Sequence, residues 1–251
     1  MGYIDGFVIA VPKANKQKFI DHASSIDPIF IELGATRVVE CWSDDVPDGK
    51  VTDFRRAVQA TGDESIAFSW IEWPDKATRD AGIAKTTQMM ADAADPRMDP
   101  EKNPAPFDGK RMIFGGFAPI LDTGSSASVG FIDGFVIAVP VANEAAYRKQ
   151  AEGGAPIFRD LGATRVVECW TDDVPHGKLT DFYGAVKAKE DEAIVFSWME
   201  YPDKATRDKA GELMMSDPRF EALGEMPFDG KRMIYAGFAP VVDLKNLGAG
   251  Q

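Results

Sequence analysis

Two glutamates and two tryptophans are spaced along neighbouring apolar segments in a way that could form a pocket wall. Glu40 and Trp42 are two residues apart, as are Trp70 and Glu72. If both segments are β-strands, each pair lies on one face of its strand. If those faces coincide, the four side chains line one apolar surface holding two carboxylates. Burial there would raise the carboxyl pKa and suit either glutamate to act as a general base or acid.

The same pattern recurs 128 residues later, with Glu168, Trp170, Trp198 and Glu200. We therefore take the four glutamates as candidate catalytic residues and the four tryptophans as candidate ligand-binding residues. Two alternatives stay open. The glutamates could form structural pairs at the sheet margin, with Arg37, Arg111 or a backbone group, because buried carboxylates also occur in structural ion pairs. The tryptophans could be ordinary core.

Other chemistries find less support in the sequence. A nucleophilic cysteine needs a nearby base, but the two histidines, His22 and His176, do not occupy matching positions relative to Cys41 and Cys169. We interpret both cysteines as buried and inert. The sequence contains no Cys-x-x-Cys or His-x-x-x-His motif and no glycine-rich phosphate loop. We therefore expect neither a metal nor a nucleotide cofactor.

The elements that must position these residues occur twice. The run from Ile4 to Pro12 returns at residues 132–140, and the run from Gly34 to Trp42 returns unchanged at residues 162–170. We predict a first repeat at residues 1–122, a linker at 123–130 rich in glycine, serine and threonine, and a second repeat at 131–251 with a short C-terminal tail. The size of each repeat indicates duplication of a whole domain.

Within the first repeat, the periodicity alternates between strand and helix. Strands are predicted at residues 3–11, 36–42, 65–73 and 111–120, with helices from Asn15 to Gly34 and from Pro74 to about Met90, and a short helical turn at residues 53–59. This βαββαβ order is that of a ferredoxin-like unit, an α+β fold whose antiparallel sheet carries helices on one face only. The bare face of each sheet must be covered.

The strings DGFVIAVP, GATRVVECW and PFDGKRMI, in this order and in both repeats, resemble the YbaA-like family, domain of unknown function 1428. That resemblance implies the dimeric α/β barrel fold, in which two ferredoxin-like domains join their bare faces, and implies no reaction. Because one chain carries both copies, we expect the barrel to close within the chain. In such a barrel, Arg111 and Arg232 could bind an anionic ligand at the mouth, or form ion pairs instead.

The repeats differ mainly in loops. Asp48 corresponds to His176, Arg55 and Arg56 correspond to Tyr183 and Gly184, and the first repeat has seven extra residues between Asp80 and Pro106. Because binding determinants commonly lie on loops, we expect the two halves to bind a ligand unequally, although drift after duplication would give the same pattern.

The net charge limits the classes of binding partner that we expect. There are 28 basic and 40 acidic residues, a net charge of −12, which disfavours nucleic acid and anionic membranes. No stretch has the length of a membrane span, the start lacks signal-peptide features, and two cysteines fit a reducing compartment, so we expect a cytoplasmic protein. We expect a monomer with pseudo-dimeric repeats, or a homodimer of such chains. Two functions remain: a small-molecule-binding barrel, or a cofactor-independent oxygenase or isomerase acting on a small apolar or aromatic metabolite.

Overall fold

The computed structural model describes residues 2–92, 95–125 and 128–246. The first repeat contains β1 (Tyr3–Pro12), η1 (Lys13–Asn15), α1 (Lys16–Glu32), β2 (Arg37–Asp45), α2 (Phe54–Ala57), β3 (Glu64–Trp73), α3 (Lys76–Asp92) and β4 (Ile113–Gly124). The second contains β5 (Phe131–Pro140), η2 (Val141–Asn143), α4 (Glu144–Asp160), β6 (Arg165–Asp173), α5 (Phe182–Ala185), β7 (Glu192–Tyr201), α6 (Lys204–Met214), α7 (Pro218–Ala222) and β8 (Ile234–Lys245).

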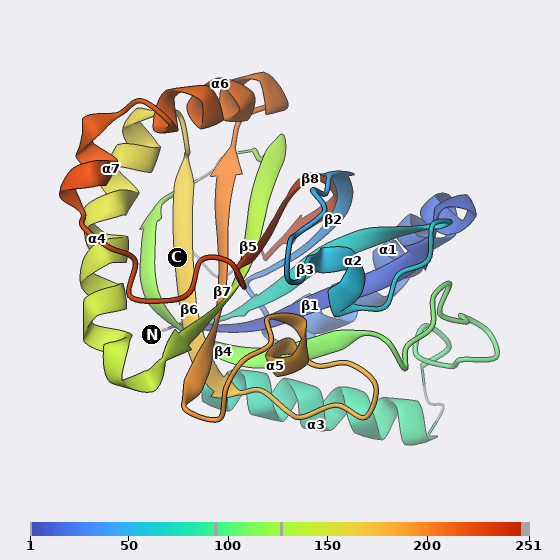
Figure 1. The fold of residues 1–251 in the computed structure, drawn as a ribbon. Helices are drawn as coiled ribbons and strands as arrows, with labels where there is room; N and C mark the ends of the chain where they lie inside the picture. Colours follow the sequence, from blue (N-terminus) through green and yellow to red (C-terminus); the bar gives the residue numbers. More distant parts are fainter. Residues whose placement is uncertain (1, 93–94, 126–127, 247–251) are drawn as a thin grey trace.

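The strands form one closed antiparallel barrel in the order β1-β3-β2-β8-β5-β7-β6-β4, with β4 returning to β1 (Figure 1). Two seams join the repeats, because β2 pairs with β8 and β4 pairs with β6. The predicted fold is therefore confirmed: two ferredoxin-like repeats form a dimeric α/β barrel within one chain. Closing the barrel leaves no free strand edges in it.

Aromatic side chains from both repeats fill the barrel interior. The rings of Phe68 and Phe196 stack with centroids 4.6 Å apart, and those of Trp70 and Trp198 lie 4.5 Å apart. The short helices α2 and α5 close one end, where Phe54 packs edge-on against Phe68 with centroids 5.9 Å apart. The interior is thus a packed core, so any cavity must lie elsewhere.

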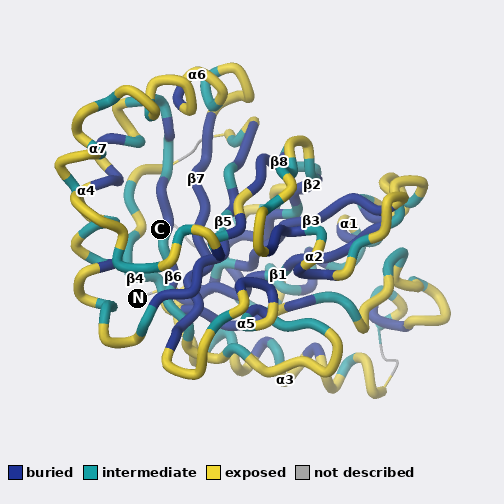
Figure 2. The backbone as a smooth tube through the Cα atoms, viewed as in Figure 1, coloured by how far each residue is buried: buried dark blue, intermediate teal, exposed yellow. Residues whose placement is uncertain are grey.

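The long helices lie outside the barrel. Helix α1 packs on β1, β2 and β8, and α4 packs on the matching strands β5, β6 and β4. Helices α1 and α4 therefore each span one seam between the repeats. Figure 2 shows the result, with buried strands inside and helices whose outer sides are exposed. None of the helices in the described residues has the length and apolar content needed to cross a membrane.

The predicted elements agree with the observed ones, apart from the end of β4. Helix α1 continues through Pro28, a residue type that can kink a helix or start a second segment. Strand β4 extends to Gly124, past the predicted end at Ile120 and into the predicted linker, because its last residues pair with β6 of the other repeat. Residues 126–127 of that linker and the tail at 247–251 lie outside the described residues, and the domain limits stay a prediction.

Candidate functional site

The strand register separates the residues that the sequence grouped together. Val39 lies opposite Trp70, and Glu40 lies opposite Ser69. Glu40 and Trp42 therefore face outward toward the helices, whereas Trp70 and Glu72 face the barrel interior. The expectation that these four side chains share one surface is wrong, and the same holds for the second repeat, where Glu168 lies opposite Ser197.

Trp42, Trp70 and Trp198 lie in the packed core, and Trp170 is half-buried against it. Trp70 and Trp198 are fully buried in the barrel. Trp42 packs against Phe19 with ring centroids 5.9 Å apart, and Trp170 packs against Tyr147 with centroids 6.2 Å apart. These positions match the alternative interpretation of the tryptophans as core. We do not include them in the candidate site.

Glu72 and Glu200 belong to a charged network that closes the barrel end opposite α2 and α5. Both oxygens of Glu72 bind Arg165 of the other repeat, at 2.8 and 3.0 Å, and Glu200 accepts from Arg37 at 2.9 Å. The indole nitrogens of Trp70 and Trp198 also donate to these glutamates, at 3.0 and 3.1 Å.

Electrostatics in this network differ from the expectation for Glu72. Burial would raise the pKa of Glu72, but the hydrogen bonds and charges of Arg165 and then Arg37 outweigh it and hold the pKa below its usual range. Glu72 is therefore ionised and structurally paired, as the ion-pair alternative described. Glu200 has no exposed surface, and its Oε2 has no partner among the described residues.

Arg111 and Arg232 are each bound by a carboxylate through two nitrogens. Arg111 donates to Glu64 at 2.9 and 2.7 Å, and Arg232 donates to Glu192 at 2.6 Å through both nitrogens. Each also bonds the aspartate of its Phe-Asp-Gly turn. This bidentate geometry matches the ion-pair alternative. It leaves both arginines outside the site proposed below.

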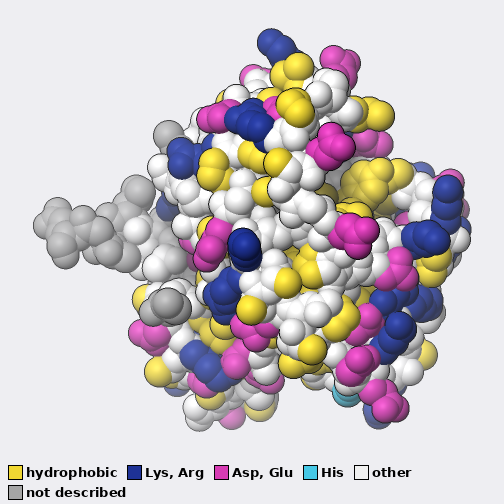
Figure 3. Space-filling view, turned by 60° about the vertical axis from the view of Figure 1, so that its left-hand side comes forward, with side chains coloured by type: hydrophobic (Ala, Val, Ile, Leu, Met, Phe, Trp, Pro, Cys, Tyr) yellow, Lys and Arg dark blue, Asp and Glu magenta, His cyan; other side chains and the backbone are white. Residues whose placement is uncertain are grey.

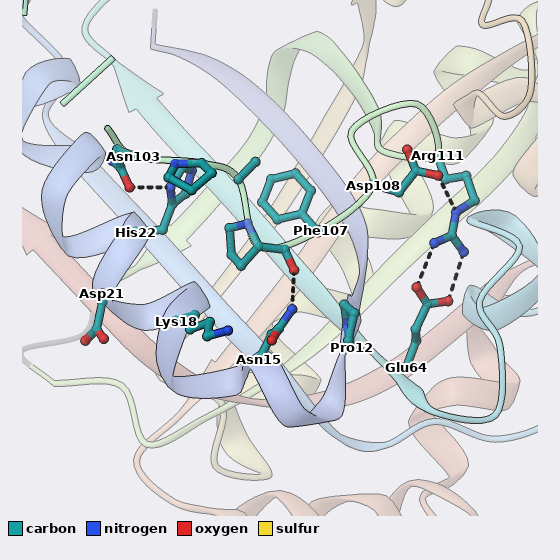
Figure 4. A pocket seen from close by; sticks show the side chains of 13 residues that line it. Pro12, Asn15, Lys18, Asp21, His22, Glu64, Asn103, Phe107, Asp108 and Arg111 are labelled. Atoms are coloured by element: carbon teal, nitrogen blue, oxygen red, sulfur yellow. Dashed lines mark hydrogen bonds and ion pairs between the residues drawn. The ribbon is translucent and has the colours of Figure 1, made fainter. Parts of the chain in front are cut away.

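The loop at residues 103–108 and helix α1 form an open groove of about 710 Å³ (Figure 4). In that view, His22 is hydrogen-bonded to Asn103 at 2.9 Å, Asn15 donates to the carbonyl of Pro106, and Arg111 binds Glu64. The difference between the repeats lies less in loops than expected, because α3 has 17 residues where α6 has 11, and Arg55 and Arg56 lie in α2. The polar groups named here already bind one another, so this groove offers little unsatisfied chemistry.

The outward-facing Glu168 lies in a cavity of about 390 Å³ between the sheet and helices α4, α6 and α7. Apolar side chains dominate its lining, including Phe135, Phe158, Met199, Phe220 and Met233. Tyr147 from α4 donates a hydrogen bond to Glu168 at 2.7 Å, and Ser197 from β7 also binds this carboxylate. The cavity thus combines apolar walls with one oriented acid, an arrangement typical of small-molecule sites.

Burial controls the acid chemistry of this cavity. It raises the pKa of Glu168 to about 7, although hydrogen bonds from Tyr147 and Ser197 oppose the shift. It also raises the pKa of the Tyr147 hydroxyl well above its usual value, helped by the nearby charge of Glu168. Glu168 can therefore gain or lose a proton near neutral pH, while Tyr147 stays protonated and keeps donating.

The first repeat has the equivalent cavity in a smaller form, about 160 Å³. Glu40 lines it and is hydrogen-bonded by Ser69. Burial raises the pKa of Glu40 to about 7. Asp27 of α1 also lines this cavity, and its pKa is raised well above the usual value, by burial and then by the charge of Glu40.

Sequence reasoning did not identify Tyr147 or Asp27. With the offset of 128, Tyr147 corresponds to Phe19, and Asp27 corresponds to Ala155. At both positions one repeat has an apolar residue and the other has a residue that carries chemistry. Most positions differ between α1 and α4, however, so these two exchanges give no distinct signal in the sequence.

Cys41 and Cys169 are fully buried in the barrel interior. Burial raises the pKa of both thiols well above the usual value, which agrees with their interpretation as inert. Within the described residues, no group of three or more histidine, cysteine, aspartate or glutamate side chains is arranged to hold a metal ion.

Comparison with known proteins assigns the family. The family model described as "Protein of unknown function (DUF1428)" matches residues 2–109 and 130–230, one match in each repeat. The chain belongs to the DUF1428 family. The protein YbaA of Escherichia coli K12, described as uncharacterized, is 59% identical over 114 residues, which are 45% of this chain and 97% of that protein. The YbaA of Shigella flexneri matches equally well. Each of these DUF1428 relatives is thus similar to one repeat.

Solved structures share the fold over the whole chain. A protein from Lactobacillus acidophilus described as a putative monooxygenase has a TM-score of 0.60 at 13% identity, covering 98% of this chain and 96% of its own. An anthrone oxidase-like protein has a TM-score of 0.56 at 10% identity, covering 98% and 94%. At these identities the likeness shows that this DUF1428 protein has their fold, and it assigns no reaction.

Proposed function

We propose that this protein binds a small apolar or aromatic molecule in the cavity of the second repeat, with Glu168 accepting a hydrogen bond or a proton from it. The observation that carries this proposal is the isolated carboxylate of Glu168 within apolar walls. The barrel closes within one chain, so a single chain supplies every residue of the cavity. This agrees with the small-molecule-binding function expected from the sequence.

The chemistry of the lining defines the ligand. Aromatic and methionine side chains favour a flat or flexible apolar molecule. Leu213, Met215 and Met226 are exposed near the end of α6 and after α7, and Met226 also lines the cavity. On the face that carries α4 and α7, hydrophobic side chains lie between charged ones (Figure 3). An apolar ligand can therefore contact apolar groups before it enters.

The pKa of Glu168 favours a second, enzymatic function. A base with a pKa of about 7 can take a proton from a bound substrate at neutral pH and return it. Returning the proton to a different carbon would be an isomerisation. Reaction of the deprotonated substrate with molecular oxygen would be an oxygenation, and the names of the two solved relatives with this fold are compatible with that chemistry.

Binding can be tested with 2-naphthol, which has an acidic hydroxyl group, and 2-methoxynaphthalene, which has the same rings without it. We expect saturable calorimetric binding of 2-naphthol that Glu168→Gln weakens at least tenfold, because a carboxylate accepts more strongly than an amide. 2-Methoxynaphthalene should bind more weakly and respond little to this change. Glu152→Gln is the matched control, since Glu152 is exposed on α4, the helix that carries Tyr147.

The proposal also predicts where the probe sits. Ala151→Trp should block 2-naphthol binding by filling the cavity that Ala151 lines. Equal affinity of the wild type and of both the Glu168→Gln and Ala151→Trp variants would show that the probe binds elsewhere and would overturn the assignment. Enzymatic function additionally requires exchange of a substrate carbon-bound hydrogen with solvent, measured by NMR in deuterium oxide.

A further inference from the structure

The cavity of the first repeat contains two acids and lacks a counter-ion. Asp27 is only 4% exposed, and its Oδ2 has no hydrogen-bond partner among the described residues. Glu40 lines the same cavity and is hydrogen-bonded by Ser69. In the part of the chain that the structure describes, neither acid has an ion-pair partner within 4.0 Å. An unpaired buried acceptor of this kind is costly.

The rest of the lining forms no ion pair with either acid among the described residues. His22 lines the same cavity, and its Nδ1 is hydrogen-bonded to Asn103 at 2.9 Å. The remaining lining residues are apolar: Phe7, Ile9, Phe19, Ala23, Ile26, Phe30, Ile71, Phe107 and Met112. Four phenylalanines thus border a space that also contains two carboxyl groups, one of which has an oxygen without a hydrogen-bond donor. Aromatic rings around a positive charge add cation–π attraction.

We propose that the first-repeat cavity binds a small organic cation with a primary ammonium group, held between Asp27 and Glu40. The ammonium has three N–H donors, enough to bond Asp27 Oδ2 and Glu40 together, and a short alkyl chain fits the phenylalanine walls. The net charge of −12 attracts cations to the protein in general. This inference concerns a different cavity from the proposed function and goes beyond it.

Two observations favour an organic cation over a metal ion. Hard cations such as calcium take six to eight oxygen ligands, and no group of three or more metal-ligating side chains exists among the described residues. The apolar lining would leave most coordination positions of a metal unfilled. An alkylammonium ion instead fits both the two acids and the apolar walls of the cavity.

The second repeat explains why this chemistry is confined to one half. Ala155 occupies the position of Asp27, which removes one acid. Tyr147 occupies the position of Phe19 and satisfies Glu168 with a hydrogen bond at 2.7 Å. Gly154 replaces Ile26, which helps to give the second cavity its larger volume. The two halves therefore differ in charge, hydrogen bonding and size at equivalent places.

Three probes of similar size test the proposal on the wild-type chain at pH 8.5, where a carboxyl with the pKa of Glu40 is ionised: propylammonium, 1-propanol and propionate. We expect saturable calorimetric binding of propylammonium, with affinity at least tenfold above that for the other two. No saturation with propylammonium up to 50 mM, or equal binding of 1-propanol, would overturn the proposal.

Variants then locate the site. Asp27→Ala installs the residue that the second repeat carries, and it should weaken propylammonium binding at least tenfold. Asp21→Asn is the matched control, because Asp21 is exposed on the same helix, and it should leave binding unchanged. Equal loss in both variants would indicate a general charge effect and contradict the proposal. If Asp27→Ala does not fold, a crystal of the wild type with propylammonium must show the nitrogen within hydrogen-bond distance of Asp27.

Discussion

Phe68 and Phe196 stack face to face at the centre of the barrel, with an angle of 4° between their rings. Each ring belongs to one repeat and packs over a glycine of the other. A Cβ added at Gly6 would lie 2.8 Å from the ring of Phe196, and one added at Gly134 would lie 2.9 Å from the ring of Phe68. The glycines thus make room for the contact that joins the repeats.

We expect Gly6→Ala to destabilise the protein by about 1–3 kcal/mol, because the new methyl group overpacks a closed aromatic core. Urea denaturation measures the free energy of unfolding. Gly62→Ala is the matched control, since nothing lies within 4 Å of its Cβ position. Equal stability of the two variants would mean that the core around Phe196 is looser than the structure shows.

A fragment of residues 1–125 should form a homodimer. On its own it would expose the edges of β2 and β4, which pair with the second repeat in the whole chain, and it would leave Phe68 uncovered. Unpaired edges and apolar faces drive association. Light scattering after size-exclusion chromatography gives the mass. A soluble monomer with native circular dichroism would contradict the idea that each repeat requires the other.

The repeat and its alternating periodicities were enough to predict two ferredoxin-like units whose bare sheet faces need a cover, and the resemblance to the YbaA-like family implied the barrel that joins them. The orientation of the glutamates could not be predicted. Alternation says that Glu40 and Trp42 share a face, but a shift of one residue in the register with β3 exchanges inside and outside. That register depends on pairs such as Val39 with Trp70, which the sequence does not specify.

The ion-pair partner of Glu72 could not be predicted from the sequence either. The sequence suggested Arg37, Arg111 or a backbone group, whereas the closer contacts come from Arg165, 93 residues away in the chain. Only closure of the barrel brings them together at the seam. The exchanges of Phe19 for Tyr147 and of Asp27 for Ala155 gave no distinct signal either, because most positions differ between α1 and α4.

Removing the guanidinium of Arg165 should be costly. Arg165→Ala leaves Glu72 with Arg37 at 3.5 Å as its remaining ion-pair partner, and breaking a buried pair typically costs about 3–5 kcal/mol. We expect a loss of that size in urea denaturation at pH 7. Arg148→Ala is the control, because Arg148 and its partner Glu144 are both exposed, and it should cost less than about 1 kcal/mol.

The same variant has a testable pH dependence. Because Arg165 lowers the folded-state pKa of Glu72 below its usual value of 4.5, the stabilisation is present above that pH and is lost as the pH falls through the folded pKa. The gap in unfolding free energy between wild type and Arg165→Ala should therefore narrow below about pH 4. A gap that stays constant down to pH 3 would argue that Glu72 is not the group stabilised.

The contribution of Glu168 to the free energy of unfolding should change with pH in the opposite direction. Its folded-state pKa is raised from 4.5 to about 7, so between these values the folded protein holds a proton that the unfolded chain has released. The free energy of unfolding therefore falls as the pH rises through this window, by about 3 kcal/mol from this one group. Glu168→Gln removes the titration, so the variant should become more stable relative to wild type from pH 4.5 to pH 8. Glu152→Gln, which is exposed, should follow the wild-type curve. Parallel curves for wild type and Glu168→Gln would show that folding does not raise the pKa of Glu168, and would contradict its assignment as a base matched to neutral pH.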